Sequence, residues 1–349
     1  MSIKDLSLFT DMSILDFEDS VLLKDSLILF LHKHIEITDT IARRFNLYSK
    51  NISGLTFRDA SSLVKDGNEL DFYYQLMKVC KGSIIILLNN LTELEPLVQA
   101  LDLNHAGTNF HLFHASQRTV NTQFGQMISD RNKSLFNLSV SGTQSHLGDE
   151  PSISRQLFDS YRLGNVYRDP EALIEPLKMA TCTIIDLSVM KQMDVPGREL
   201  ISSSGLSSET ANQIAFSAGN TSNNRIFVIS GFDLLSEPTP TAIDTVTQII
   251  YYFLQGKSTH TPMDLNEENA TSYLVESIDG FEHIEFLKFH QQNEWYVKYP
   301  MELPDSHKMF KLIPCNYFDY EYSAAGELSP RLYEIFMALH QFRQGDALA

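Results

Sequence analysis

Paired cysteines, long apolar runs and an excess of basic residues are all missing from this chain of 349 residues. Its three cysteines, Cys80, Cys182 and Cys315, stand far apart without the spacing of a zinc or redox motif, so we expect buried, reduced thiols. No stretch approaches the roughly 18 to 20 consecutive apolar residues that span a bilayer, and the acidic N-terminal segment is unlike a signal peptide. The sequence therefore predicts a cytoplasmic protein that does not enter a membrane.

Acidic residues outnumber basic ones, with 44 Asp and Glu against 27 Lys and Arg and a formal charge of -17. Such a surface repels phosphate backbones, and no cluster of basic and aromatic residues offsets it locally, so we expect no nucleic-acid partner. Apolar residues, in contrast, make up 43% of the chain, and aromatic residues make up 11%. That composition predicts a large buried core.

The middle of the chain alternates short apolar runs with helical patterns. Runs without Gly or Pro predict strands buried on both faces at Ser83–Leu88, Asn109–Phe113, Thr183–Leu187 and Arg225–Ile229. Apolar residues at helical spacing predict helices over Leu70–Val79 and Pro240–Leu254, the second with Thr239 as its N-cap. This alternation is typical of parallel strands joined by crossover helices.

The pattern changes after Gly256. Strand-like runs at Tyr273–Ser277, Glu282–Phe289 and Glu294–Tyr299 predict a small antiparallel sheet. We therefore expect an α/β domain over residues 1–258 and a β-rich C-terminal extension over 259–349 packed on it. The polar segment Ser202–Thr210 predicts a loop on the ligand-binding side of the first domain.

Several short motifs occur in a definite order. Among them are Leu135–Asn137 (LFN), Gly142–Gln144 (GTQ), Tyr161–Gly164 (YRLG), Ile185–Gly197 (IDLSVMKQMDVPG), Ala218-Gly219 and Pro314-Cys315. In this order and spacing the chain resembles the formiminoglutamase-like bacterial branch of the arginase (ureohydrolase) family over nearly its whole length. The resemblance implies a three-layer α/β/α fold around a mainly parallel sheet, and it favours a homo-oligomer.

The resemblance also implies the place of a dinuclear manganese site. In this family a hydroxide held between two Mn²⁺ ions attacks a guanidine or amidine carbon, and carboxylates and imidazoles hold the ions. The corresponding positions hold Leu91, His114, Ser116, Arg118, Asp186 and Ser188. Only Asp186 is retained, and Ser230 marks the position of a carboxylate that would bind the substrate's amidinium.

These replacements predict a pseudoenzyme without catalytic residues, metal or cofactor, whose retained function is binding to another protein or to copies of itself. Because the guanidinium of Arg118 is always charged, we hypothesise that it pairs with Asp186 in place of a metal. The alternative is a remodelled pocket of His114, Ser116, Arg118, Asp186 and Ser188 that binds a small anionic ligand or hydrolyses a C–N bond of an amidine.

Further histidines leave two interpretations open. His32 and His34 would share one face of a strand, and we expect a solvated face rather than a metal site there. His105, His111, His114 and His146 lie around the region of the lost site. They predict either hydrogen-bonded remnants or, with Asp186, a single-metal site of another kind. Gly142–His146 predicts a loop, with a carboxylate-binding loop as the alternative.

Overall fold

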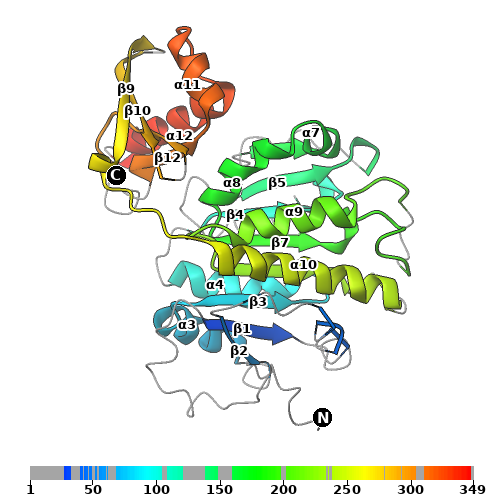
Figure 1. Cartoon of the computed structure of the whole chain (residues 1–349). Coiled ribbons are helices and arrows are strands. Elements are labelled where there is room, and N and C mark those ends of the chain that lie inside the picture. Colours follow the sequence, from blue (N-terminus) through cyan, green and yellow to red (C-terminus); the bar gives the residue numbers. More distant parts are fainter. Residues whose placement is uncertain are drawn as a thin grey trace. The chain divides into compact units, whose positions relative to one another are not determined.

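Figure 1 shows a computed structural model of the whole chain. The described residues form two compact units, the first ending at His260 and the second beginning at Thr261, and each is considered by itself. The structure describes residues 27–32, 40–41, 43–45, 47–48, 52, 55–59, 61, 68–103, 108–120, 138–147, 159–197, 202–232, 235, 238–278, 280–291, 293–303 and 310–346.

The first unit is built on an eight-stranded sheet in the order β2-β1-β3-β8-β7-β4-β5-β6. All of its strand pairings are parallel. The strands are β1 (Leu27–His32), β2 (Thr56–Asp59), β3 (Ser83–Leu87), β4 (Phe110–Phe113), β5 (Leu138–Thr143), β6 (Asp159–Arg162), β7 (Cys182–Asp186) and β8 (Ile226–Ser230). The four predicted central strands are thus confirmed as β3, β4, β7 and β8, within one residue at each end.

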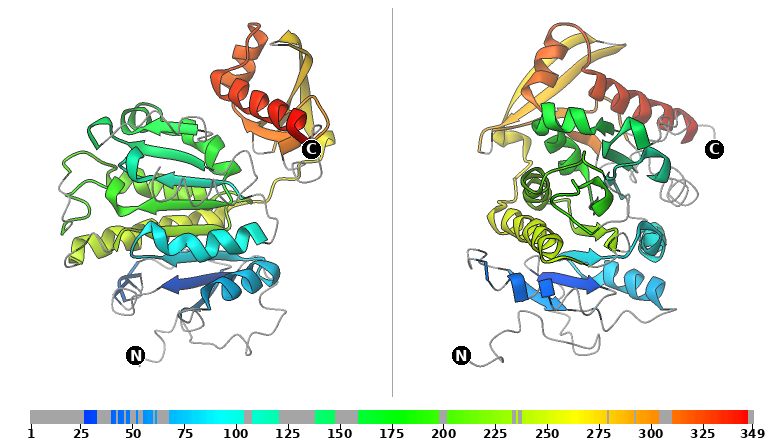
Figure 2. Two further views of the ribbon diagram at one scale, coloured as in Figure 1. Left: turned by 180° about the vertical axis from the view of Figure 1, so that it is seen from behind. Right: turned by 90° about the vertical axis from the view of Figure 1, so that its right-hand side faces the viewer.

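Helices cover both faces of this sheet, so the expected three-layer fold is confirmed (Figure 2). One face carries α3 (Glu69–Val79) and α4 (Glu95–Leu103). The other carries α8 (Ile174–Met179), α9 (Ser208–Gly219) and α10 (Pro240–Thr259). Successive strand residues point to opposite faces, which is why strands covered on both sides are apolar without alternation.

The helices α9 and α10 pack through two glycines. A Cβ on Gly219 would lie 2.1 Å from the Phe253 carbonyl oxygen, and one on Gly256 would lie 2.2 Å from the Phe216 carbonyl oxygen. The two backbones therefore approach closer than any side chain would allow. The start of α10 agrees with the prediction, because the Thr239 side chain accepts a hydrogen bond from the Ala242 amide.

Two local predictions differ from the structure. Helical spacing predicts one buried face of α3 with Leu70, Tyr73, Leu76 and Val79. The residues buried in α3 are Phe72, Tyr73 and Leu76, whereas Leu70 and Val79 are 36% and 40% exposed. The predicted loop Ser202–Thr210 ends early, since Ser207 accepts a hydrogen bond from the Thr210 amide and so caps α9. The helix α3 was thus predicted with the wrong residues at the edges of its buried face, whereas the helix that begins after Ser207 was not predicted.

The second unit contains a four-stranded antiparallel sheet in the order β12-β11-β10-β9. Its strands are β9 (Ala270–Ile278), β10 (Phe281–Phe289), β11 (Glu294–Lys298) and β12 (Leu312–Cys315), and the first three were predicted. The segment is less β-rich than expected, because α11 (Tyr317–Ala324) and α12 (Pro330–Asp346) follow. An Asn316–Asp319 capping box starts α11, and its Tyr320 ring stacks on Trp295.

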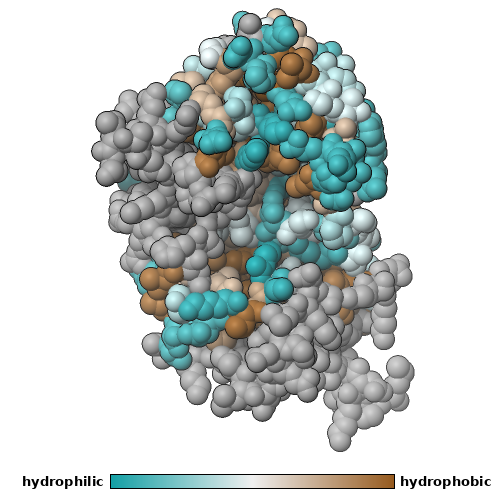
Figure 3. All heavy atoms as spheres, turned by 90° about the vertical axis from the view of Figure 1, so that its left-hand side faces the viewer, coloured by the Kyte–Doolittle hydropathy of each residue, from teal (hydrophilic) through white to brown (hydrophobic). Residues whose placement is uncertain are grey.

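The distribution of apolar residues agrees with the sequence. No helix in the described ranges combines the length and apolarity that crossing a bilayer requires. On the face drawn in Figure 3, apolar residues occur in small groups among polar ones. Cys80, Cys182 and Cys315 are buried free thiols, as expected, and burial raises the pKa of Cys80 and Cys182.

Candidate functional site

The carboxyl ends of β4, β7 and β8 bring three of the predicted site residues together. Asp186 is the last residue of β7 and Ser230 the last of β8, and the two are register partners. His114 directly follows β4, whose Phe113 is paired with Ile185 of β7. Parallel strands end on the same side of a sheet, so these side chains meet at one edge.

Asp186 is buried at this edge, with 4% of its surface exposed, and both of its carboxylate oxygens have protein partners. The Ser230 hydroxyl donates to Oδ2 at 2.6 Å, and the Ser188 amide donates to Oδ1 at 3.0 Å. His114 Nε2 lies 3.6 Å from Oδ1. We call Asp186 with His114, Ser188 and Ser230 the Asp186 cluster.

A glycine makes room for this carboxylate. Gly231, the residue after β8, has a φ of +91°, and a Cβ on it would lie 3.2 and 3.3 Å from the two Asp186 carboxylate oxygens. A side chain there would press on the carboxylate in a backbone conformation that L-residues avoid. The position of the Asp186 carboxylate therefore depends on the close approach of the Gly231 backbone as well as on its hydrogen bonds.

His114 and Ser116 hold each other through local hydrogen bonds. His114 Nδ1 accepts the Ser116 amide hydrogen at 2.9 Å and lies 3.1 Å from the Ser116 carbonyl oxygen. The shorter contact leaves Nε2 to carry the ring proton toward Asp186. Ser116 also caps the short helix α5 (Gln117–Thr119) and donates its hydroxyl to the Leu147 carbonyl oxygen at 3.1 Å.

Two of the predicted positions lie apart from the Asp186 cluster. Arg118 is in α5 with an exposed side chain, and among the described residues it is His114, not Arg118, whose side chain lies within 4 Å of the Asp186 carboxylate. The hypothesised Arg118–Asp186 pair is therefore not formed, because α5 turns Arg118 outward. Leu91, the first residue of η4 (Leu91–Leu94), is 2% exposed and belongs to the apolar core beneath α3 and α4.

Gln144 adds a buried polar side chain to the same edge of the sheet. It follows β5, and its amide donates to the Ala115 carbonyl oxygen at 2.9 Å. The residue is 6% exposed, yet both its Oε1 and Nε2 lack a hydrogen-bond partner among the described residues. Buried amides are normally paired, so an unpaired one at the same edge of the sheet as the Asp186 cluster is a ligand-binding candidate.

The remaining histidines do not complete a metal site among the described residues. His111 is fully buried on β4, where its Nε2 pairs with the Ser141 hydroxyl at 2.8 Å and burial lowers its pKa to about 3. It is thus a neutral, hydrogen-bonded core residue. His146 is exposed in η6 (Ser145–Leu147), while His34 and His105 lie outside the described residues, as does the side chain of His32. No group of three or more His, Cys, Asp or Glu is placed to hold a metal within the described ranges.

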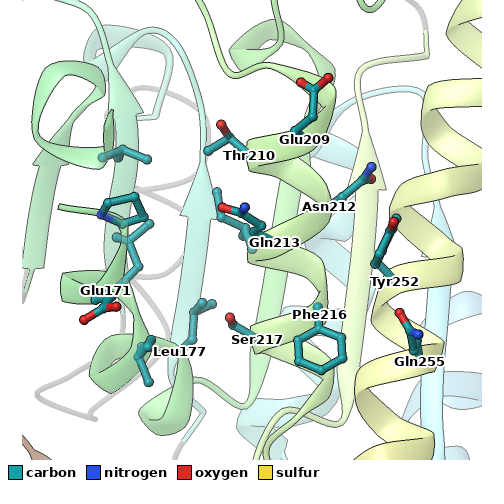
Figure 4. Close-up of a pocket in the computed structure, with 15 residues that line it drawn as sticks. Glu171, Leu177, Glu209, Thr210, Asn212, Gln213, Phe216, Ser217, Tyr252 and Gln255 are labelled. Carbon is teal, nitrogen blue, oxygen red and sulfur yellow. The ribbon is translucent and has the colours of Figure 1, made fainter. Parts of the chain in front are cut away.

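A groove of about 610 Å³ lies elsewhere, over the outer surface of α9 between α8 and α10 (Figure 4). Its floor and walls mix apolar with polar side chains, including Leu177, Gln213, Phe216 and Tyr252. None of the predicted site residues lines it. The prediction missed α9 itself, although Ser207 as a cap before the spaced Ala211, Ile214 and Ala218 would have indicated that helix.

Comparison with known proteins bears on the fold. No protein-family model and no curated protein matches the chain. A manganese-bound formiminoglutamase from Trypanosoma cruzi is 16% identical with a TM-score of 0.57, and the match covers 73% of this chain and 98% of that one. Formimidoylglutamase from Bacillus subtilis is 14% identical with a TM-score of 0.54, covering 68% and 87%. A hypothetical agmatinase from Burkholderia thailandensis is 10% identical with a TM-score of 0.54, and the match covers 66% of this chain and 85% of that one.

This chain has the fold of formiminoglutamase. The formiminoglutamase-like fold expected from the motifs Tyr161–Gly164 and Ile185–Gly197 is thus confirmed at very low sequence identity. Within that fold, the Asp186 cluster lies at the carboxyl ends of the central strands, the edge on which open α/β sheets bind ligands. The groove over α9 lies on a helical face instead.

Proposed function

We propose that the chain belongs to the ureohydrolase family but has lost its dinuclear manganese site, and that it acts in the cytoplasm as a non-catalytic binding protein. The formiminoglutamase fold supports the family assignment. One observation carries the loss of the metals: the retained carboxylate, Asp186, has both oxygens engaged by the Ser230 hydroxyl and the Ser188 amide. Hydrogen bonds from the protein thus stabilise this carboxylate in the place where the family has a metal.

The residues at the corresponding positions do not fit two Mn²⁺ ions. Manganese takes several carboxylate, carbonyl or imidazole ligands, whereas Leu91 is apolar and buried, and Ser116 already donates to a carbonyl oxygen. Arg118 cannot ligate a cation, because its guanidinium is permanently positive, and its side chain is exposed on α5. Ser230, in the position of the substrate-binding carboxylate, carries no negative charge for an amidinium. The replacements thus remove the metal ligands and the substrate ligand together.

Metal content and hydrolysis test this proposal directly. The full chain, expressed and dialysed with excess Mn²⁺, should retain far less than one ion per chain by mass spectrometry. It should also show no hydrolysis of formiminoglutamate, arginine or agmatine. An Asp186→Ala variant should leave both results unchanged. Two Mn²⁺ per chain, with a turnover that Asp186→Ala abolishes, would contradict the proposal.

The binding function that we propose is self-association. Ureohydrolase-like proteins commonly form homo-oligomers, and a scaffold without chemistry can be retained for the assembly it forms. The full chain should therefore sediment as an oligomer at micromolar concentration. A chain that sediments as a monomer at every concentration would leave only a different protein as the bound partner.

A second candidate function is the binding of a small anion at the same edge of the sheet. Gln144 supports it, because an anion could accept the hydrogen bond that its buried Nε2 does not make. Phosphate, malonate and glutamate should then raise the melting temperature of the native chain, and Gln144→Leu should abolish that increase. If no anion raises the melting temperature and Gln144→Leu is more stable than the native chain, Gln144 is only an unpaired polar group. That result would contradict anion binding at this edge.

A further inference from the structure

The edge strands of the two sheets differ in length. Three of the four edge strands of the described sheets, β2, β6 and β12, are only four residues long. The fourth, β9, has nine residues and is paired only with β10 among the described residues (Figure 2). Exposed strand edges are templates for pairing with another chain, and short edges are one way of avoiding it. The edge of β9 is the long one.

The sequence of β9 also lacks the residues that block edge pairing. Proteins protect edges with Lys, Pro or a bulge. On the opposite edge of the same sheet, β12 has Pro314 within its four residues. In contrast, β9 reads ATSYLVESI with no Lys, Arg or Pro, and its register with β10 is regular along the strand. Leu274, at its midpoint, is 58% exposed.

The hairpin of β9 and β10 determines which backbone groups of β9 point toward β10 and which point outward. Ile278 pairs with Phe281 across a two-residue connection, and the residues that close such a hairpin exchange hydrogen bonds. Alternation then directs the backbone groups of Ile278, Glu276 and Leu274 toward β10. The amides and carbonyls of the alternate residues, such as Tyr273 and Val275, point outward from the edge. They are the groups that an added strand would bind.

We propose that β9 pairs antiparallel with β9 of a second copy of this chain, about a two-fold axis that passes through Leu274. This interface specifies the self-association in the proposed function and rests on it. Leu274 is the midpoint of Ala270–Ile278, so this register overlaps the whole of both strands. The two four-stranded sheets become one continuous eight-stranded sheet. A two-fold contact uses the same patch on both copies and closes on itself.

The side chains fit this register. Leu274 faces its own copy in a non-hydrogen-bonded pair, in which Cα atoms lie about 4.5 Å apart and side chains are closest. Tyr273 faces Val275 of the second copy, an aromatic and β-branched pair of the kind that stabilises sheets. The one charged side chain, Glu276, faces Ser272, so no like charges meet directly. The exposed Leu274 is buried in the process.

The size of the contact sets its strength. Two strands meeting edge to edge form a small interface, below the roughly 1,200 Å² at which specific, stable complexes begin. The dimer should therefore dissociate on dilution in the micromolar range. Sedimentation equilibrium of the full chain across a wide dilution series should show a reversible monomer–dimer equilibrium.

Two substitutions at the axis test the interface. Leu274→Lys places two ammonium groups in the closest pair and should weaken the dimer at least tenfold. Leu274→Cys should form a disulfide-linked dimer under mild oxidation, because the Cα separation of a non-hydrogen-bonded pair suits a disulfide. The native cysteines Cys80, Cys182 and Cys315 are buried and should not compete. Circular dichroism and Trp295 emission verify that each variant is folded.

The same substitutions at Leu265 provide the control, since Leu265 is 43% exposed and lies outside the strand. Leu265→Lys should not change the dissociation constant, and Leu265→Cys should crosslink slowly. An unchanged dimer in Leu274→Lys, or crosslinking of Leu265→Cys as fast as that of Leu274→Cys, would overturn the β9 interface while self-association stood. A native chain that is monomeric at every concentration would contradict both the β9 interface and the proposed self-association. The measurements of manganese content would not be affected by that result.

Discussion

Ser230→Ala tests whether the Asp186 cluster stabilises the first unit. Ser230 is fully buried and donates to the Asp186 carboxylate at 2.6 Å, while Asp186 itself is 4% exposed. Removing the hydroxyl leaves a buried carboxylate oxygen without its donor. Hydrogen bonds to charged groups contribute about 1.5 to 3 kcal/mol to stability, so we expect a loss of about 2 kcal/mol in the free energy of unfolding.

Ser141→Ala is the matched control, because Ser141 is also fully buried but its hydroxyl pairs with the neutral imidazole of His111. A neutral hydrogen bond contributes about 0.5 to 1.5 kcal/mol, so the loss should be smaller by about 1 kcal/mol. Urea unfolding followed by circular dichroism measures both losses. The single tryptophan, Trp295, lies in the second unit, and its emission should report an unchanged transition there. Equal losses for the two variants would refute the argument that the Ser230 hydroxyl supports a buried charge.

Two further predictions concern the helix crossing and pH. Gly256→Ala should lower the free energy of unfolding by at least about 1 to 3 kcal/mol, since its Cβ would lie 2.2 Å from the Phe216 carbonyl oxygen. Gly164→Ala, with nothing within 4 Å of its Cβ, should have no such effect; equal urea midpoints would refute the close crossing. Burial lowers the pKa of His111 from 6.5 to about 3, so between these values the unfolded chain binds a proton that the folded chain does not. The free energy of unfolding should therefore fall as pH decreases through this window, and His111→Asn should reduce that slope; an identical slope in both proteins would contradict a neutral, buried His111.

The fold could be predicted because its central strands carry their own signal. Strands such as Ser83–Leu87 and Ile226–Ser230 are covered by helices on both faces, so nearly every residue is apolar and the run is recognisable without context. The helices of the second unit were missed for the opposite reason. The buried residues of α11 are the polar Asp319 and Ser323, so its apolar pattern does not indicate a buried face.

The sequence predicted where the candidate site lies in the fold, but not which side chain faces Asp186. The motif around Ile185–Gly197 located Asp186, and the parallel sheet brings it to the ends of β4 and β8. That His114 and not Arg118 faces Asp186 depends on α5, which turns Arg118 outward. The cap of α5, Ser116, is held by the Leu147 carbonyl oxygen, 31 residues away in the chain. A contact so distant in sequence has no local signal.

The most direct test of the proposed loss of the metal site is anomalous diffraction at the manganese edge from a crystal of the full chain soaked in MnCl₂. Our account predicts no anomalous peak within about 5 Å of the Asp186 carboxylate, since a hydroxyl, an amide and an imidazole already face it, and metal–ligand distances are well below that limit. Two peaks bridged by Asp186 would contradict it.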